Sequence, residues 1–328
     1  MLLSKSVRVA LVPISASLLI AGCGGGGSSA GGKSVSVGVS SLVDLAPIFL
    51  GEQKGFFKDV GLSLNIKVQA SGSATLAGIT SGSLDVGYSN TTSLLIAQGQ
   101  GLNFRIVCSA AEIGPTAAQD DSGVMVRSDS SIRTAADLDG KTIGVNTLKS
   151  GGVLATQLTL KKAGVNLDDV HFVEIPRAGA VQAVVSKRID ALADVEPLPT
   201  LAEKSKLRKV IGEWSWAVGL PGASTGVFFT SSKHLASNKN QVDKFRQAML
   251  KSLAYATAHT GEARKVLTAK LKIEPSIAAA VALPQWKGQV GKKFMGMLAQ
   301  SIKTEGLADK TTDITPLFDS APSSVVTP

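Results

Sequence analysis

Few residues of this chain are cysteine, histidine or aromatic. Its 328 residues include two cysteines and three histidines, and aromatic residues make up 5% of the chain. Two cysteines are too few for a disulfide framework. Three histidines that lie far apart in the sequence do not favour a histidine-based metal site. We therefore expect neither a bound metal nor a cofactor.

The sequence also lacks any cluster of basic residues, although the net charge is +9. Lys and Arg form no run and do not alternate with aromatic residues, so we expect no nucleic-acid partner. With 44% hydrophobic and 18% charged residues, the composition is that of a globular protein with a sizeable core. The length predicts about two domains.

The first 23 residues show the order of features of a bacterial lipoprotein signal. Lys5 and Arg8 precede an apolar run over 9–20, which is about half of the ~20 residues that a membrane span needs. Ile-Ala-Gly-Cys then ends at Cys23 and matches the lipobox, in which the cysteine is acylated and becomes the new N-terminus. We expect a signal peptide over 1–22, and Cys23 carrying lipid at the start of a Gly/Ser-rich tether over 23–33. An uncleaved N-terminal anchor is the alternative.

Two segments of the chain recur about 105 residues later. Residues 35–41 resemble 141–147, and 77–86 resemble 183–191. The pattern predicts two lobes built on one plan, each alternating strands with helices around a parallel sheet. The expected elements are a strand at 35–39, helix 45–57, strand 64–69, helix 73–82 and strand 84–88, then strand 142–146, helix 151–163, strand 170–175, helix 178–187 and strand 189–193. Apolar β runs at 123–127 and 226–230 flank the second copy, and helices follow at 238–259, 261–271, 274–283 and 286–304.

Ligands of open α/β sheets bind at the carboxyl ends of the strands, near helix N-termini. The loops expected there are rich in Ser, Thr, Asn and Gly, and the second lobe adds a loop over 194–196. Hydroxyls, free N–H groups and a guanidinium are suited to an anion. The candidate ligand-binding residues are Ser40, Ser41, Ser71, Gly72, Ser73, Ser89 and Asn90 in the first lobe, and Thr147, Ser150, Gly151, Arg177 and Glu196 in the second.

A structural role is the alternative for each of these candidates. Ser and Asn are common helix N-caps, and Arg177 can pair with a neighbouring acid instead of a ligand. Asp85 and Asp190, which recur at the same offset, are expected to be structural residues at strand ends. Cys108 lies in an apolar stretch and is expected to be a buried small side chain.

Several segments together resemble the solute-binding proteins of bacterial ABC importers. The likeness is to the branch that binds nitrate, sulfonates, taurine, bicarbonate and thiamine precursors. The segments are Pro47–Phe49, Lys54–Leu62, Ser71–Ser73, Gly82–Gly87, Ala136–Val145 and Ile189–Pro197. The resemblance implies a type II periplasmic-binding-protein fold of class α/β, with two lobes joined by a two-strand hinge. Lobe 1 would comprise 34–123 and 229–328, and lobe 2 residues 124–228.

The resemblance implies binding rather than catalysis. We expect a monomeric, lipid-anchored extracytoplasmic protein, in the periplasm or on the outer cell surface. It would capture a small anionic solute, such as a sulfonate, taurine, nitrate, bicarbonate or an aromatic carboxylate. An ABC permease with its cytoplasmic ATPase would receive that solute. The alternatives are a thiamine-precursor pyrimidine as ligand, or a ligand-sensing subunit of a signalling receptor.

An enzyme is the less favoured class. Residues 222–226 match G-x-S-x-G, but a β run follows Ser224 where the nucleophile elbow requires a helix. Gly140-Lys141-Thr142 lacks the first glycine of a phosphate-binding loop. We therefore expect no catalytic residue.

Overall fold

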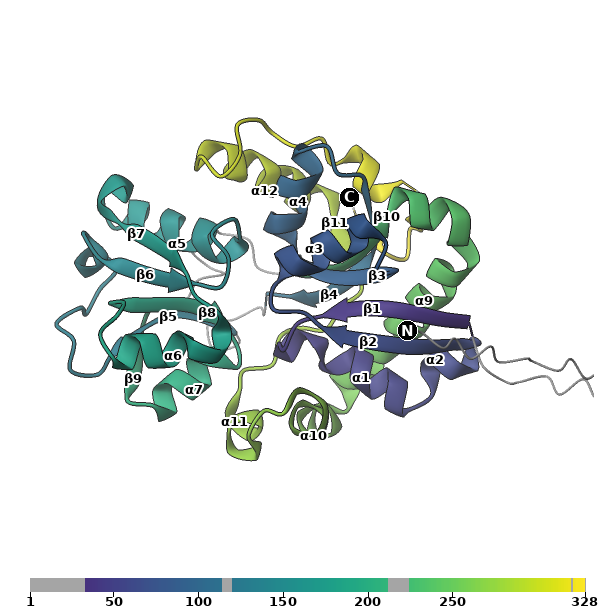
Figure 1. Ribbon diagram of the computed structural model, residues 1–328, viewed down its shortest axis with the longest axis horizontal. Helices are drawn as coiled ribbons and strands as arrows, with labels where there is room; N and C mark the ends of the chain where they lie inside the picture. The colour runs from purple at the N-terminus through teal and green to yellow at the C-terminus, as the bar shows by residue number, and fades with distance from the viewer. Residues whose placement is uncertain (1–32, 114–119, 212–223, 320, 328) are drawn as a thin grey trace, which may run out of the picture. The chain divides into compact units, whose positions relative to one another are not determined.

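The computed structural model describes residues 33–113, 120–211, 224–319 and 321–327 (Figure 1). Two five-stranded mixed sheets with helices on their faces make up this part of the chain. The signal, lipobox and tether expected over 1–33 lie outside the described residues, except for Lys33, which belongs to β1 instead of the tether. None of the described helices is long and apolar enough to span a membrane.

The first sheet has the strand order β2-β1-β3-β10-β4. Its strands are β1 (Lys33–Val39), β2 (Leu62–Val68), β3 (Val86–Asn90), β4 (Phe104–Glu112) and β10 (Ser224–Ser231). β1 lies between β2 and β3 and is parallel to both, whereas β10 is antiparallel to β3 and β4. The sheet therefore combines strands from the beginning of the chain with one that follows the second repeat.

The second sheet has the equivalent order, β7-β6-β8-β5-β9. Its strands are β5 (Ser122–Arg127), β6 (Thr142–Val145), β7 (His171–Glu174), β8 (Ala191–Val195) and β9 (Leu207–Ile211). Here β6 is parallel to β7 and β8, and β5 is antiparallel to β8 and β9. The two sheets match strand for strand, which confirms the internal repeat predicted from the sequence.

Asp85 and Asp190 have the same structural role in the two sheets. Asp85 accepts a hydrogen bond from the backbone N–H of Ser36 at 2.8 Å, and Asp190 accepts one from that of Thr142 at 2.9 Å. Each carboxylate thus joins β1 or β6 to the residue that leads into the neighbouring strand, β3 or β8. This confirms that both residues are structural.

The helices of the two repeats lie where the sequence predicts them, with one correction. The expected helix 45–57 is divided into α1 and α2, because Gly55 has a φ of +80°, which a right-handed helix does not allow. Gly61 and Gly164 end the first helical segment of each repeat with positive φ, as expected. The helical elements are η1 (Val43–Leu45), α1 (Ala46–Gln53), α2 (Phe56–Asp59), α3 (Gly72–Ser81), α4 (Thr91–Gly99), η3 (Ala136–Leu138), α5 (Gly151–Lys162), η4 (Leu167–Asp169), α6 (Arg177–Val185) and α7 (Leu198–Lys204).

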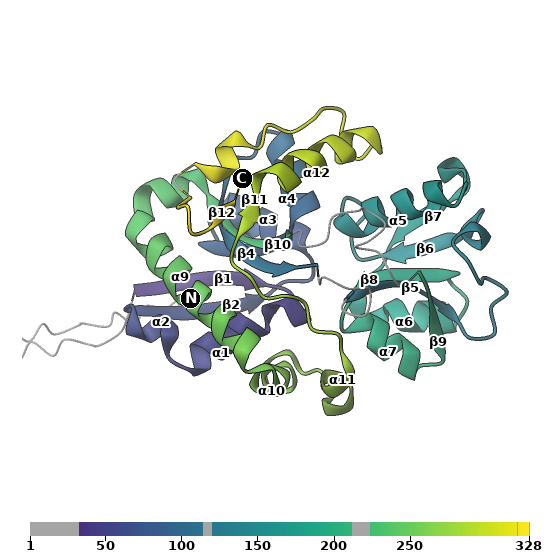
Figure 2. The same ribbon diagram turned by 180° about the vertical axis from the view of Figure 1, so that it is seen from behind.

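The C-terminal part of the chain returns to the first sheet. Its elements are α9 (Ser232–Ala258), α10 (Thr260–Leu271), α11 (Pro275–Ala280), β11 (Val290–Gly291), α12 (Lys292–Thr304), η5 (Thr315–Phe318) and β12 (Val326–Thr327). Figures 1 and 2 both show α9 and α12 beside the first sheet. α9 begins six residues before the expected start, because a short helical segment joins it across a kink at Asn238, and α12 begins at Lys292 instead of 286.

Both faces of the first sheet are covered by apolar side chains. Along β10, Phe228 packs into one cluster with Phe245 of α9, whereas Phe229 on the opposite face packs with Phe104 and with residues of α3, α4 and α12. The second sheet likewise has a cluster under α5 and another under α6 and α7. Cys108 is fully buried in the first sheet, and burial raises the pKa of its thiol to about 12, which confirms the predicted core position.

The strands β5 and β10 occupy equivalent places in different sheets. β5 lies in the second sheet, and all of β10, from Ser224 onward, pairs within the first. We propose the division into lobe 1 (34–123 and 229–328) and lobe 2 (124–228) with two adjustments, the assignment of 224–228 to lobe 1 and of 122–123 to lobe 2. Ser224 lies inside β10, and its hydroxyl donates to the carbonyl of Gln289 at 3.0 Å.

Candidate functional site

A cavity of ≈160 Å³ lies where strands of both sheets end. We call it the central cavity. The residues that follow β1, β3, β6 and β8 line it, and α5 and α12 complete its wall. The polar lining residues are Ser40, Asp44, Tyr88, Asn90, Thr91, Thr92, Asp121, Ser122, Asn146, Thr147, Ser150, Arg177, Asp194 and Thr225. The volume is roughly ten times that needed by one water molecule, so a small organic molecule can fit.

Seven of the twelve predicted ligand-binding residues line the central cavity: Ser40, Gly72, Asn90, Thr147, Ser150, Gly151 and Arg177. They come from the ends of β1, β3 and β6 and from the starts of α3, α5 and α6, as the strand-end argument predicts. That they contact a solute stays a prediction.

The other five predicted residues are not part of the lining. The Ser71 hydroxyl accepts from Ala74 N–H at 3.2 Å and caps α3, while Ser41 and Ser73 are exposed. Ser89 is fully buried in β3. Glu196 accepts hydrogen bonds from Thr200 and from the backbone N–H of Ala282, so local bonds occupy its carboxylate.

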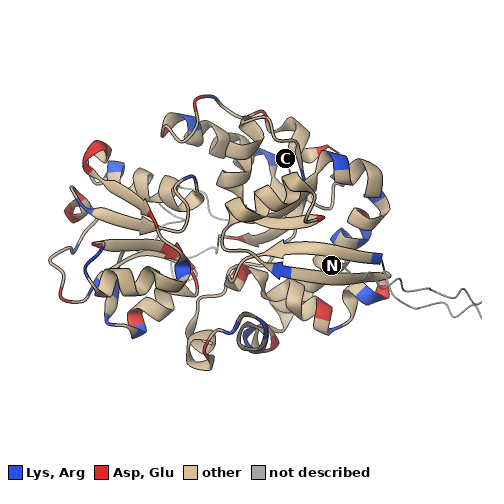
Figure 3. Ribbon diagram, in the orientation of Figure 1, with Lys and Arg blue, Asp and Glu red and all other residues tan. Residues whose placement is uncertain are grey.

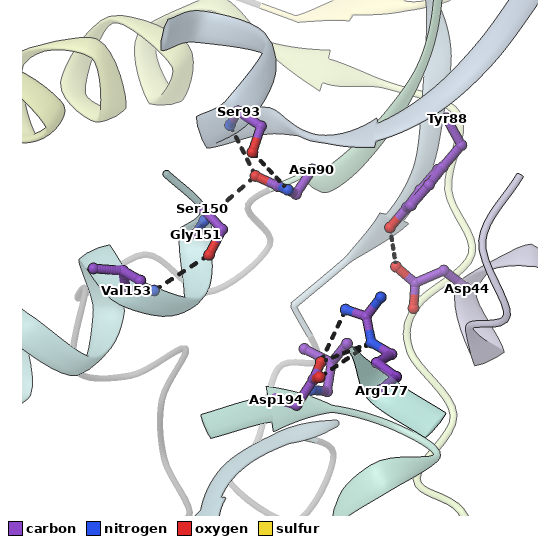
Figure 4. A network of polar contacts seen from close by, with 10 residues as sticks. Asp44, Tyr88, Asn90, Ser93, Ser150, Gly151, Val153, Arg177 and Asp194 are labelled. Atoms are coloured by element: carbon purple, nitrogen blue, oxygen red, sulfur yellow. Dashed lines mark hydrogen bonds and ion pairs between the residues drawn. The ribbon is translucent and has the colours of Figure 1, made fainter. Parts of the chain in front are cut away.

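Asn90 connects the starts of two helices across the central cavity (Figure 4). Its Oδ1 accepts from Ser93 N–H at 2.8 Å, which caps α4, and from Gly151 N–H at 3.3 Å, at the start of α5. The hydroxyl of Ser93 donates to the carbonyl of Lys149 at 2.6 Å. These bonds join a helix of the first lobe to a helix of the second, beside the cavity.

Arg177 forms a paired ion contact with Asp194. Its Nε lies 3.1 Å from both carboxylate oxygens of Asp194, and its Nη2 lies 2.9 Å from Oδ1 (Figure 4). The side chain of Asp194 is 5% exposed and that of Arg177 is 22% exposed. Of the two interpretations of Arg177, the structure thus shows the pair with a neighbouring acid. The N–H of Nε and one of Nη2 are thus used in the pair with Asp194.

Three carboxylates of the lining were not predicted from the sequence: Asp44, Asp121 and Asp194. Asp44 is 4% exposed, and the hydroxyl of Tyr88 donates to it at 2.6 Å. Burial raises the pKa of Asp44 and outweighs the opposite effect of the Tyr88 hydrogen bond. The pKa of Tyr88 is also raised well above 10.0, first by burial and then by Asp44.

The pKa of Asp121 is raised by neighbouring negative charges as well as by burial. Burial, followed by the negative charges of Asp44, Asp120 and Glu196, raises the pKa of Asp121 well above its ordinary value of 3.8. Figure 3 shows charged residues mostly on helices and loops, with the strands of both sheets largely uncoloured.

The sequence contained a signal for each of these carboxylates. Asp44 interrupts the apolar segment from Leu42 to Leu50, and Asp120-Asp121 directly precedes the apolar strand β5. Asp194 lies in the loop that was selected, two residues before Glu196. A carboxylate within or beside an apolar run is a candidate buried charge, which needs a partner or a function.

Residues 43–263 match the family described as NMT1/THI5-like, and the chain belongs to this family. A Brucella abortus (strain 2308) protein named as a candidate binding protein is 30% identical over 149 residues. That match covers 45% of this chain, and the chain spans less than half (43%) of that relative's length.

Solved structures of similar fold are solute-binding proteins. The alkanesulfonate-binding protein SsuA from Xanthomonas axonopodis pv. citri superposes with a TM-score of 0.74 at 19% identity, covering 87% of this chain and 97% of SsuA. The nitrate-binding protein NrtA from Synechocystis PCC 6803 has a TM-score of 0.74 at 14% identity, covering 89% and 86%. With the two equivalent sheets, these similarities confirm the periplasmic-binding-protein fold.

We predict that Arg177→Ala destabilises the protein, because it leaves the buried Asp194 carboxylate without its ion partner. The free energy of unfolding should fall by about 2–3 kcal/mol, measured by urea denaturation. Arg127→Ala is the matched control, since Asp129, its ion partner, is 72% exposed, and a change within about 0.5 kcal/mol is expected. Equal effects of the two variants would contradict the importance of the Arg177–Asp194 pair.

Asp121→Asn should stabilise the ligand-free protein at neutral pH. Because folding raises the pKa of Asp121, its protonated form contributes stability below pH 3.8, and that stability is lost as the pH rises through the raised pKa. The variant should therefore have the higher Tm at pH 7, and the difference should vanish in acid. Asp59→Asn, at a carboxylate that is 62% exposed, is the control. A pH-independent difference would refute the cause assigned here.

Proposed function

We propose that this protein is the extracytoplasmic solute-binding component of an ABC importer. The observation that carries the proposal is the central cavity, which residues from both lobes line at the carboxyl ends of their strands. A solute there contacts both lobes at once. It therefore stabilises the arrangement in which the lobes are together, through its greater affinity for that state. A permease that recognises this state then receives the solute, and a cytoplasmic ATPase supplies the energy.

No chemical transformation is part of this proposal. Asn90 and Arg177, which line the cavity, form hydrogen bonds and an ion pair that hold helix starts in place. Curated relatives are named as binding proteins. A ligand-sensing subunit of a signalling receptor would use the same site and the same closure, so it remains the alternative for the partner.

An anionic solute is the expectation from the sequence, with a pyrimidine as its alternative. The net charge and the family resemblance support an anion. The described cavity lining favours it less, since its one guanidinium is paired with Asp194 while two further carboxylates face the same space. The solute screen must therefore include all of these classes.

A thermal-shift screen tests the binding function. The panel holds alkanesulfonates, taurine, nitrate, bicarbonate, aromatic carboxylates, pyrimidines and small amines. A solute at ~100 times its Kd should stabilise the protein by about 2.7 kcal/mol, which raises Tm visibly. Ala155→Phe should abolish that rise, because the 7%-exposed Ala155 lines the cavity and a phenyl ring would fill it.

Ala269→Phe is the matched control, because Ala269 is exposed on α10, away from the cavity lining. The control should retain the full solute-dependent rise in Tm. No rise with any panel member, or a rise that survives Ala155→Phe, would count against solute capture in the central cavity.

We further propose that Cys23 carries the lipid that attaches the protein to the membrane. The order of basic residues, apolar run and lipobox supports this. Wild-type protein expressed in a bacterial host should enter the detergent phase on Triton X-114 partitioning, and Cys23→Ala should remain in the aqueous phase. Detergent partitioning of both forms would indicate an uncleaved anchor.

A further inference from the structure

We infer that the solute carries a protonated nitrogen, which binds to the carboxylates of Asp44 and Asp121, and an apolar body held by the rest of the central cavity. This rests on the proposed function and specifies its ligand. The class comprises small organic ammonium compounds.

The balance of charge in the cavity lining is the first support. Its described residues include three carboxylates and one basic side chain, Arg177. Arg177 pairs with Asp194 through their two-pronged contact, and its charge acts more weakly on Asp44, where it lowers the pKa but does not offset the effect of burial. Asp44 and Asp121 are left without an ion-pair contact to a basic residue of that described lining. An anionic solute would add a further negative charge to this space, whereas a cationic one would neutralise it.

Asp44 is held in place for such a contact. Tyr88 donates its hydroxyl to Oδ2 of Asp44 at 2.6 Å, and Tyr88 itself is 4% exposed (Figure 4). The bond fixes the orientation of the carboxylate within the wall of the cavity. A hydrogen bond with an ionised partner is roughly twice as strong as one between two neutral groups, and an ammonium solute adds a full opposite charge to the carboxylate.

The apolar part of the lining would contact the apolar body of the solute. Leu42, Ile113, Val145, Leu154, Phe294 and Leu298 also face the cavity. A bare ammonium or metal ion would leave these side chains and most of the ≈160 Å³ unfilled. An organic cation satisfies the carboxylates and covers the apolar wall in the same molecule.

The repulsion between the carboxylates gives a further reason to expect a cationic solute. The negative charges of Asp44 and Asp121 repel each other within the fold. Buried carboxylates of this kind destabilise a protein unless something pairs with them. A cationic solute provides this pairing and would therefore stabilise the folded protein.

Solutes of equal size and different charge test the inference. We would measure Kd by isothermal titration calorimetry for benzylammonium, benzyl alcohol and benzoate, and for butylammonium, butanol and butyrate, with the full folded protein. We expect the ammonium member of at least one series to bind most tightly. Asp121→Asn should weaken that binding by about 10- to 100-fold, the usual effect of a hydrogen bond to a charged group.

Asp44→Asn should weaken ammonium binding to a similar extent, since an Asn oxygen can still accept from Tyr88. If this variant does not fold, Asp121→Asn alone decides the question. Asp59→Asn, which changes the net charge equally on an exposed side chain, should leave Kd unchanged. Tighter binding of benzoate or butyrate, no binding by either ammonium compound, or equal losses in Asp121→Asn and Asp59→Asn would each overturn the inference.

Failure of this inference differs from failure of the proposed function. If an anion or a pyrimidine of the wider panel raises Tm in an Ala155-dependent way while both ammonium compounds fail to bind, only the solute class is wrong. If no compound of either set binds, solute capture itself is contradicted.

Discussion

The site depends on the parallel arrangement of β1 with β3 and of β6 with β8. Parallel strands end at the same edge of a sheet, so their following loops meet there, with helix N-termini beside them. Because the second sheet repeats the order of the first, the chain has two such edges. Residues from both contribute to the central cavity. A single lobe would provide only half of this lining, and this is why a bound solute can report on the positions of both lobes.

The sequence was sufficient for the arrangement of the fold and for about half of the candidate site. The repeated glycine and aspartate positions and the alternating apolar runs predict both sheets, because local periodicity and caps are encoded in neighbouring residues. Helix 45–57 was predicted as continuous, since its break depends on the φ of the single residue Gly55. Ser71 caps α3 and is not among the described lining residues, and the sequence alone does not separate the two roles because both require the same hydroxyl.

That the acidic residues meet in one cavity could not be found in this way. Asp44 and Asp121 lie 77 positions apart in the chain, and only the folded sheet arrangement brings their charges into one cavity. The pairing of Arg177 with Asp194 depends equally on the packing of α6 beside β8. The net charge of +9 favoured an anionic solute instead. Most charged positions lie on helices and loops, so the net charge does not predict the charge of the cavity.

The hydrogen bond of Asn90 between the lobes can break without loss of the N-cap of α4. Its oxygen caps α4 within the first lobe and bonds to Gly151 in the second. If the lobes separate, the capping bond to Ser93 remains, and water can replace Gly151 at the same oxygen. The Lys149 carbonyl can exchange its bond to the Ser93 hydroxyl for a bond to water in the same way. In the proposed mechanism, therefore, the lobes would separate without unwinding of α4 or α5. The hydrogen bonds between the lobes would be exchanged for bonds to water.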